Sequence, residues 1–552
     1  MTPSAREIFS SSACSRGVFP ASSSSLARAK RKIRYSHLTK KKVSNRRASA
    51  TTTKMNIICA SASAKNNNNN NNNNNRISCG DAIVNESLTP PPASGAEFDV
   101  IVIGNGPLGA AIGLHLSEKK EKKILILDSG EESLSSGSDD LGRIVRPLDA
   151  EGREEWTQLN IDSIRSFREI QEESEIEFFE KKGSLSIGSR AFVSRPASLL
   201  EAKGIEHEIL RGRDEMCEKF EYLSPKTIPE EYIAVSDRVG GYVSPHKMRA
   251  AFNRLAVKNN EWTKVCVQTG EEIVASTTTD KNDDDGFVKV RTTDGNEYVA
   301  KEKVIVACGY YTQPLLHRSK IDMESLEDVK ISKRTIILAK VSEEDAKGRF
   351  RDMPTIKYEL PESVRSTRTT TDTSTSGTSD QSKNEAKSVY ILPPIWYPGP
   401  VPSPGYYVKI GGGPNDFMTL SKAVMFDGEK NDIDKNKEKK SPIEQRKELD
   451  SVWEDHRKAT YEDQKEDIES WMNSDGDPEI VPQLKTALLH VFPDVQFKSF
   501  ETKACATTCT SNGSMKIEHY SEGKIWAVTG CNGKAAGPAW AIAKEVVANA
   551  SL

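Results

Sequence analysis

A glycine-rich turn between an apolar strand and a helix is the feature that most constrains the fold. The chain reads Phe98-Asp-Val-Ile-Val-Ile-Gly104-Asn-Gly106-Pro-Leu-Gly109, continues with small and apolar residues, and reaches Ile124-Leu-Ile-Leu-Asp128. This order predicts a buried strand, a tight turn, a helix and a second strand. Gly104 permits the turn, Gly106 lets the backbone approach a pyrophosphate, and Gly109 lets the helix lie close to the strand.

The acid at the end of the second strand completes a dinucleotide-binding pattern. Asp128 lies nineteen residues after Gly109 and is placed to accept a hydrogen bond from a ribose hydroxyl. A glycine-rich turn without a nucleotide is the alternative, but the surrounding strand, helix, strand and acid favour the dinucleotide. The motif alone does not distinguish FAD from a nicotinamide cofactor.

The N-terminal region differs in charge from the rest of the chain. Residues 1–95 contain fifteen Lys or Arg and three acids, whereas 96–552 contain 62 basic and 77 acidic side chains. A basic leader rich in Ser, Ala and Thr is typical of an organelle transit peptide, which we place at 1–60. Ile57-Ile-Cys-Ala60 resembles a chloroplast processing site, so a plastid is expected, with the mitochondrion as the alternative. A low-complexity spacer with ten consecutive Asn follows at 61–96.

The composition argues against several other classes of protein. The acidic body disfavours a nucleic-acid-binding role for the basic leader. The nine Cys include no CxxC pair, and the eight His form no cluster with ligand spacing, so neither a disulfide framework nor a metal site is expected. No apolar run approaches the length of a membrane span.

Periodicity predicts further strands and helices along the chain. Helices are expected at 153–176, 246–258 and 539–548. Strands are expected at 183–188, 241–244, 303–308, 335–340, 406–410 and 524–529. The polar stretches 276–286, 361–387 and 427–447 lack apolar periodicity, and we interpret them as surface insertions, the last two as disordered.

Several separated blocks resemble the D-amino-acid oxidase superfamily of flavoproteins, and most closely its monomeric sarcosine oxidase branch. They are 98–109 with Asp128, 142–146, 181–188, 240–245, 304–309, 407–411, 505–512 and 525–533. The resemblance implies FAD and an α/β fold. It implies a Rossmann-like FAD-binding domain made of discontinuous segments and an α+β substrate domain with a large antiparallel sheet. The expected FAD-binding segments are 97–190, 236–330 and 490–552, and the expected substrate segments are 191–235 and 331–489.

The resemblance also implies roles for particular residues. Cys505 opens the block Cys-Ala-Thr-Thr-Cys-Thr-Ser-Asn, which looks like the segment that carries the flavin-linked cysteine, although a buried apolar cysteine is the alternative. Lys409 matches the lysine beside the reactive flavin nitrogen, where a positive charge favours electron transfer to oxygen. An exposed strand lysine is the alternative. Cys509 shares a strand face with Cys505 but is too distant to bridge to it.

Two arginines and a second glycine turn complete the expected site. Arg143 is expected near the flavin and Arg146 on the substrate carboxylate, for which a planar two-pronged donor is suited. Surface salt bridges are the alternative for both. Gly530 and Gly533 belong to the last block, which is expected to contact FAD.

The chain departs from the family at substrate-side positions. Gly537 replaces the carboxylate-binding lysine, unless Lys534 reaches the same place. Gly413 replaces the active-site histidine, Thr507 a tyrosine, and Asp139 a histidine near the arginines. Sarcosine itself is therefore not assumed to be the substrate.

These features favour an FAD-dependent oxidase of a small amine or amino acid, acting on CH–NH or CH–NH2 groups. A hydride equivalent would pass to the flavin, water would hydrolyse the imine, and oxygen would take the electrons as hydrogen peroxide. An FAD-dependent dehydrogenase of a 2-hydroxy acid or amine with another acceptor stays open, as does a flavin-binding protein without turnover. A nicotinamide-dependent reductase would need a second GxGxxG after a strand, which the sequence lacks. The oligomeric state stays open, with a monomer as one option.

Overall fold

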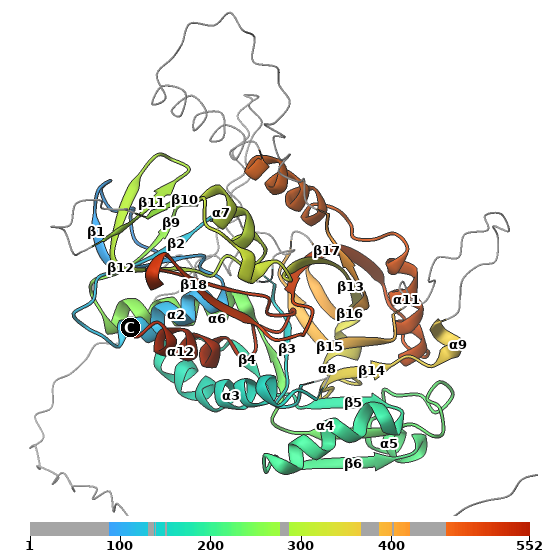
Figure 1. Ribbon diagram of the computed structural model, residues 1–552. Coiled ribbons are helices and arrows are strands. Elements are labelled where there is room, and N and C mark those ends of the chain that lie inside the picture. Colours follow the sequence, from blue (N-terminus) through green and yellow to red (C-terminus); the bar gives the residue numbers. More distant parts are fainter. Residues whose placement is uncertain are drawn as a thin grey trace, which may run out of the picture. The chain divides into compact units, whose positions relative to one another are not determined.

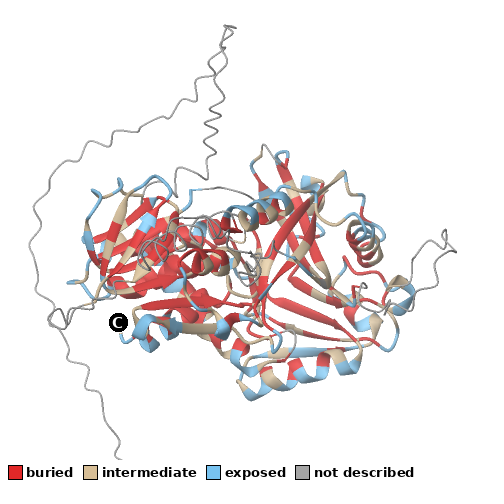
Figure 2. Cartoon of the chain, turned by 45° about the horizontal axis from the view of Figure 1, so that its top comes forward, coloured by how far each residue is buried: buried red, intermediate tan, exposed pale blue. Residues whose placement is uncertain are grey.

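The computed structural model describes residues 88–130, 137, 140–149, 152–275, 286–365, 386–399, 402–419 and 460–552, all within one compact unit (Figure 1). Two eight-stranded sheets dominate this described part of the chain. Figure 2 shows that their strands are mostly buried, whereas exposed residues gather on the outer sides of the helices and in the connecting loops.

The first sheet has a parallel centre that contains the predicted dinucleotide strands. Its order is β10 (Gly270–Ala275), β11 (Val288–Thr292), β12 (Glu297–Val306), β1 (Glu97–Ile103), β2 (Ile124–Asp128) and β9 (Thr263–Val267), with β19 (Ile525–Thr529) beside β12 and β18 (Lys516–Tyr520) beside β19. Strand β1 pairs in parallel with both β12 and β2. Val100 and Val102 pack on one face of the sheet, and Ile101 and Ile103 on the other. Burial of both faces explains the uninterrupted apolar run in β1.

Helices cover both faces of this sheet. One face packs against α2 (Pro107–Ser117) and α6 (Pro245–Asn259), and α3 (Glu154–Ser174) and α12 (Ala539–Asn549) pack on these helices. The other face packs against α7 (Thr312–Arg318), which contributes Leu315 and Leu316 to the core. Helix α2 begins at Pro107, directly after Gly106, and is buried over its whole length. Its N-terminus therefore stands at the carboxyl end of β1, where nucleotide phosphates bind in such folds.

The second sheet is antiparallel except for one pair. Its order is β17 (Ser499–Cys509), β13 (Lys330–Val341), β16 (Gly405–Phe417), β15 (Ser388–Tyr397), β14 (Thr355–Glu359), β5 (Ser184–Gly188), β7 (Ile233–Asp237) and β6 (His207–Arg211). Only β14 and β5 run parallel. Helix α11 (Ile480–Val491) packs its apolar side on β13 and β16.

The remaining described elements connect or flank the sheets. They are β3 (Arg143–Val145), β8 (Gly241–Val243) and β4 (Phe179–Glu180), which form a small third sheet, and α4 (Arg190–Ala202), α5 (Arg213–Lys219), α8 (Glu343–Lys347), α9 (Glu362–Arg365) and the 3-10 turns η1 (Gly309–Tyr311), η2 (Glu324–Leu326) and η4 (Ser521–Gly523). Residues 460–472 are also helical. No helix in the described ranges is both long and apolar enough to cross a membrane.

The predicted helices at 153–176, 246–258 and 539–548 are confirmed as α3, α6 and α12, and the predicted strands are found within a few residues. The placement of two segments differs from the expected domains. Strands β5 and β17, which we grouped with the FAD-binding segments, hydrogen-bond within the second sheet. The domain boundaries themselves stay a prediction.

The polar insertions fall mostly outside the described residues, including 276–285, 366–385 and all of 427–447. The start of the insertion expected at 361–387 differs from the prediction, because it forms the short helix α9. Val364 packs against the apolar core around α11, which stabilises this turn of helix. At the base of the insertion, Leu360 N donates to Lys387 O at 3.0 Å.

Candidate active site

The turn after β1 is crowded enough to require glycine. Gly104 has φ +101°, and a Cβ there would lie 2.6 Å from the carbonyl oxygen of Ala307. A Cβ on Gly109 would lie 1.7 Å from the Gly104 carbonyl oxygen. Helix α2 can therefore lie this close to the turn only because residue 109 is a glycine. The first backbone N–H groups of the helix face the space beyond Gly106. The predicted roles of Gly104 and Gly109 in chain packing agree with this geometry.

The acid at the end of β2 belongs to a small polar cluster. Asp128 Oδ2 accepts hydrogen bonds from Asn105 Nδ2 at 3.1 Å and from Arg249 Nη1 at 3.3 Å. Asn105 is buried, and its Oδ1 has no hydrogen-bond partner within the described part of the chain. Thr529 Oγ1, at the end of β19, is in the same situation. Such orphaned polar atoms beside a glycine cradle fit a polar ligand such as a dinucleotide.

A cavity of about 1540 Å³ connects this cradle with the second sheet. Residues from the cradle line one end, including Gly104, Gly106, Asp128 and Arg249. Residues from β13, β16 and β17 line the other end, including Arg334, Gly413, Cys505 and Thr507. The volume exceeds the roughly 300–1,000 Å³ of an ordinary small-molecule pocket. It is large enough for a cofactor together with a substrate.

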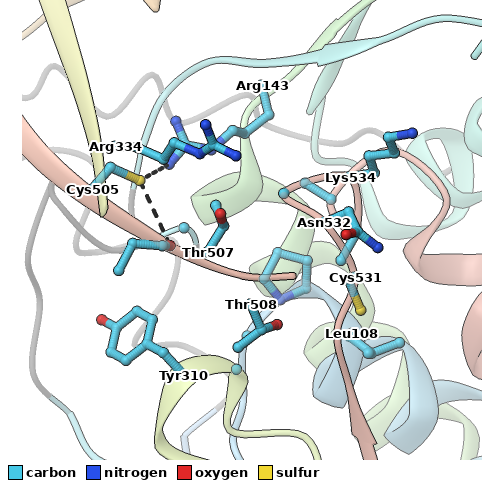
Figure 3. A pocket seen from close by; sticks show the side chains of 18 of the residues that line it. Leu108, Arg143, Tyr310, Arg334, Cys505, Thr507, Thr508, Cys531, Asn532 and Lys534 are labelled. Atoms are coloured by element: carbon cyan, nitrogen blue, oxygen red, sulfur yellow. Dashed lines mark hydrogen bonds between the residues drawn. The ribbon is translucent and has the colours of Figure 1, made fainter. Parts of the chain in front are cut away.

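Cys505 stands in the cavity wall between two arginines. Strand β17 pairs with β13 in a register that places Cys505 opposite Arg334. Arg143 Nη2 donates to Cys505 Sγ at 3.7 Å, and Figure 3 shows the guanidinium groups of Arg143 and Arg334 beside the sulfur. All six described cysteines are free thiols, Cys505 and Cys509 among them. We call the part of the cavity around Cys505, Arg143 and Arg334 the sulfur end.

Lys409 lies behind the sulfur end and is not among the residues that line the cavity. Its side chain is completely buried, and its ammonium donates to the Asp140 carboxylate and, at 3.0 Å, to the Gly142 carbonyl oxygen. Asp140 also accepts from Arg143, and from the Tyr397 hydroxyl at 3.0 Å. Arg143 itself lines the cavity. The structure thus brings both predicted cations together, but through a carboxylate that we did not predict.

Burial and charge act in opposite directions in this group. Burial raises the pKa of Asp140, but Lys409 and Arg143 outweigh it and hold that pKa well below its usual range. Burial, followed by the positive charge of Arg143, lowers the pKa of Lys409 to about 8, although Asp140 pulls it upward. Burial likewise disfavours the charge of Arg143, but Asp140 more than compensates and raises its pKa. Arg143 is therefore protonated throughout the accessible pH range.

The other predicted residues lie close to the cavity. Arg146 and Gly533 line it, whereas Gly530 (φ +69°) forms the turn just behind, where a Cβ would lie 2.6 Å from Thr510 Cγ2. Lys534 lines the cavity too, and its Nζ lies 2.7 Å from Asp149 Oδ1.

Three of the substitutions noted in the sequence can be placed. Gly413 and Thr507 line the cavity. A Cβ on Gly537 would lie 2.9 Å from Asn160 Oδ1, so a lysine at this position would collide with Asn160 in the present arrangement. Asp139, the fourth, is outside the described residues.

Four cavity or wall residues were missed by the sequence analysis: Asp140, Arg249, Arg334 and Tyr390. Tyr390 lies over Gly411 on the neighbouring strand, where a Cβ would be 2.3 Å from the tyrosine hydroxyl oxygen. Burial raises the pKa of Tyr390 to about 12. A cross-strand pair of tyrosine and glycine depends on register, so no local sequence signal could have revealed it. For Arg249, a charged residue on the apolar side of a predicted helix was an available signal.

No group of three or more His, Cys, Asp or Glu side chains able to hold a metal ion occurs among the described residues.

Comparison with known proteins finds similar sequences among oxidases. Over 230 residues the chain is 29% identical to monomeric sarcosine oxidase from a Bacillus species, covering 41% of this chain and 55% of that protein. It is 26% identical over 224 residues to N-methyl-L-tryptophan oxidase from Citrobacter koseri, covering 40% and 55%. The chain thus spans about half the length of the curated relatives that it matches.

Solved structures share the fold over a longer range. The amino acid oxidase NikD, described as essential for nikkomycin biosynthesis, aligns with a TM-score of 0.53 at 16% identity, covering 82% of this chain and 94% of NikD. At that identity the likeness shows the fold alone. A model of the family described as FAD dependent oxidoreductase matches residues 99–549, which is most of the chain. The protein therefore belongs to the FAD-dependent oxidoreductase family.

Proposed function

We propose that this protein is an FAD-dependent oxidase of a small amine or amino acid. The observation that carries the proposal is the single cavity that joins a dinucleotide cradle to the sulfur end. The names of the relatives support the substrate class, since they include sarcosine oxidase, N-methyl-L-tryptophan oxidase and an amino acid oxidase.

The residues of the cradle suit FAD. The turn at Gly104 and Gly106 and the N-terminus of α2 would hold the pyrophosphate, and Asp128 with Asn105 would hold a ribose. The free acceptor on Asn105 suits a hydroxyl donor. When bound, FAD supplies a hydride acceptor for the C–H bond next to the substrate nitrogen. We further propose that Cys505 is the point of covalent attachment.

The substrate would lie at the sulfur end. Arg146, which lines the cavity, would pair with a substrate carboxylate, and a guanidinium can do so through two parallel hydrogen bonds. Tyr390 offers a hydroxyl that burial keeps protonated. Gly413 and Thr507 leave more room than the larger side chains expected from the family. The structure thus supports a carboxylate-bearing amine larger than sarcosine.

Positive charge at the sulfur end supports oxygen as the electron acceptor, because negative charge develops when oxygen is reduced. Arg143 lines the cavity and carries this charge, whereas Lys409 lies inside the wall and does not line the cavity. The buried position of Lys409, paired with Asp140, also favours a second candidate, a dehydrogenase that uses another electron acceptor. The chain would then lack the lysine charge that we expected beside the flavin.

One experiment separates these functions. The purified holoenzyme is mixed with a panel of amines, N-methyl amino acids and 2-hydroxy acids, while flavin absorbance and hydrogen peroxide are followed. Bleaching by an amine, followed by recovery in air with release of peroxide, is the expected result. Bleaching without recovery in air indicates the dehydrogenase, and no bleaching by any compound contradicts the proposal.

We also propose that residues 1–60 direct the protein to the plastid. Their basic, Ser-rich composition supports this, and a fluorescent protein carrying these residues is expected to enter plastids. Import into mitochondria instead would support the alternative.

A further inference from the structure

Three side chains from distant parts of the chain share one carboxylate behind the sulfur end. Asp140 is almost fully buried and accepts hydrogen bonds from Lys409, Arg143 and the Tyr397 hydroxyl, and from the backbone N–H of Leu141 at 2.7 Å. These contacts use both carboxylate oxygens. A buried carboxylate with this many donors has one orientation and stays ionised.

The two cations that share Asp140 face different surroundings. The Lys409 ammonium is held from a second side by the Gly142 carbonyl oxygen at 3.0 Å, and its side chain is 0% exposed. Arg143 retains 17% exposure of its side chain, lines the cavity and directs Nη2 toward Cys505. The carboxylate therefore fixes one cation inside the wall and the other at its surface.

We propose that Asp140 is a positioning residue that keeps Lys409 inside the wall and presents Arg143 to the cavity as the positive charge beside Cys505. The inference rests on the proposed function in one respect, because it requires this charge to act on bound flavin. It reassigns to Arg143 the role that the sequence suggested for Lys409. A guanidinium at this place stays charged at every accessible pH, whereas an amine at the cavity surface titrates.

Other titratable groups also face Asp140, Lys409 or Arg143, namely Cys505 and Lys503 on β17 and Tyr390 and Tyr397 on β15. Tyr390 in turn faces Arg334 on β13, and Tyr397 faces Tyr242 on β8. Of these, Tyr397 contacts Asp140 directly, and its hydroxyl donates a hydrogen bond to the carboxylate. The removal of Asp140 therefore leaves the buried Lys409 ammonium with no carboxylate among the described groups that face it.

The test measures how fast dithionite-reduced flavin is reoxidised by oxygen in the holoenzyme, from about pH 6.5 to about pH 9.5, the range in which amines with lowered pKa titrate. No amine substrate is needed. The wild type is expected to show a rate that does not fall with pH. The reoxidation rate of Lys409→Met should stay within about threefold of the wild-type rate. The rate of Arg143→Gln should be at least about tenfold lower, because the variant loses a donor that stabilises developing negative charge.

The decisive variant is Asp140→Asn. Without its partner, Lys409 can turn toward the cavity, so the reoxidation rate should acquire a fall with rising pH at or below about pH 8, the pKa of the paired lysine. The double variant Asp140→Asn/Lys409→Met should lose this pH dependence again. The proposal is wrong if the reoxidation rate of the wild type already falls as the pH rises through 8 and Lys409→Met abolishes that fall. It is also wrong if Asp140→Asn leaves the profile unchanged.

A second measurement does not depend on the flavin reaction. Asp140→Asn should lower the melting temperature, because the buried Lys409 ammonium loses its counter-charge, and added Lys409→Met should recover part of the loss. If the double variant melts at no higher temperature than Asp140→Asn, the claim that Asp140 holds Lys409 is wrong. Purification without flavin would contradict the proposed function, while this melting comparison would still decide whether Asp140 holds Lys409.

Discussion

At the scale of single residues, the nucleotide end of the cavity depends on backbone segments that approach too closely for any side chain. Gly104 touches the end of β12, and Gly109 touches Gly104 itself. The sequence motif predicted these glycines correctly because the constraint is local. The Gly104 contact shows in addition that Ala307, two hundred residues away, forms the other side of the turn.

Gly104→Ala is expected to destabilise the protein and abolish flavin binding. The left-handed backbone alone costs about 1–2 kcal/mol for a residue with a side chain, and the 2.6 Å approach to Ala307 adds a collision. Gly295→Ala is the matched control, since Gly295 has φ +82° with nothing within 4 Å of a Cβ. Urea unfolding and flavin absorbance measure both effects. Equal losses in the two variants would show that the close approach does not matter.

Cys505→Ser tests the proposed attachment of flavin. Acid denaturation of the wild type should leave the yellow colour with the protein, and that of Cys505→Ser should release it. Cys509→Ser is the control, because Cys509 is also a buried free thiol on β17. Release of flavin from the wild type would exclude a covalent bond without excluding FAD as a cofactor.

Asp140 shows where residue-level reasoning fails. Lys409 was identified from its strand block, and Arg143 from its position in another block. Their common partner is separated from Lys409 by 269 positions, and no pattern in the sequence joins the two. The electrostatic environment of a buried group depends on its neighbours in space, so neither the shift of its pKa nor its orientation could be predicted.

At the scale of elements, helix α2 is held between the sheet and the helices α6 and α12. His115 lies at the contact with α12, where its Nε2 is 3.0 Å from the Trp540 carbonyl oxygen and its ring is 4.9 Å from the Trp540 ring. Burial lowers the pKa of His115, although Trp540 and Glu118 pull it upward. The neutral ring is therefore the form that fits the helix contact.

The free energy of unfolding should fall as the pH drops below neutrality, and His115 should account for part of this fall. Its folded pKa lies below its unfolded value of about 6.5, so its contribution is present above pH 6.5 and is lost as the pH falls through the folded pKa. One such group changes the slope of the free energy of unfolding against pH by at most about 1.4 kcal/mol per pH unit. Urea unfolding between pH 7 and pH 5 should show a shallower slope for His115→Gln. His519→Gln, at an exposed position, should keep the wild-type slope.

Strand register is a second element-level property that the sequence left open. The apolar pattern predicted strands that correspond to β13 and β16, but the pairing of Arg334 with Cys505 and of Tyr390 with Gly411 was not predicted. A shift of one residue would turn either side chain to the opposite face of the sheet. Only the packed sheet decides which side chains share the cavity.

At the scale of the whole molecule, the residues just before β1 belong to the first sheet. Thr89 N donates to Val265 O at 2.7 Å, and Gly95 N donates to Glu297 O at 2.7 Å. The Tyr298 hydroxyl donates to the carbonyl oxygen of Pro92 at 3.2 Å. These residues fall in the stretch 61–96 that we expected to be a spacer, so its end differs from that expectation.

A protein that begins at Ala96 is expected to be less stable than one that begins at Leu88. Loss of the hydrogen bonds that this segment makes, at about 1 kcal/mol each, should cost several kcal/mol. The melting temperature should fall by several degrees, with flavin bound in both proteins. Differential scanning calorimetry of the two proteins measures the difference. Equal melting temperatures would show that the segment before β1 contributes nothing to the sheet.

The sequence by itself determined the strand-turn-helix cradle and the helices at 153–176, 246–258 and 539–548. It also singled out Arg143, Arg146 and Cys505, which line one cavity, and Lys409, which lies behind the cavity wall. These follow from local spacing, from periodicity and from resemblance. Only the tertiary structure decided that β5 and β17 join the second sheet, that Arg249 and Asn105 meet Asp128, and that Asp140 holds Lys409 inside the wall. The physical reason is that burial, register and charge pairing are properties of side chains brought together by folding, and distance along the chain does not specify them.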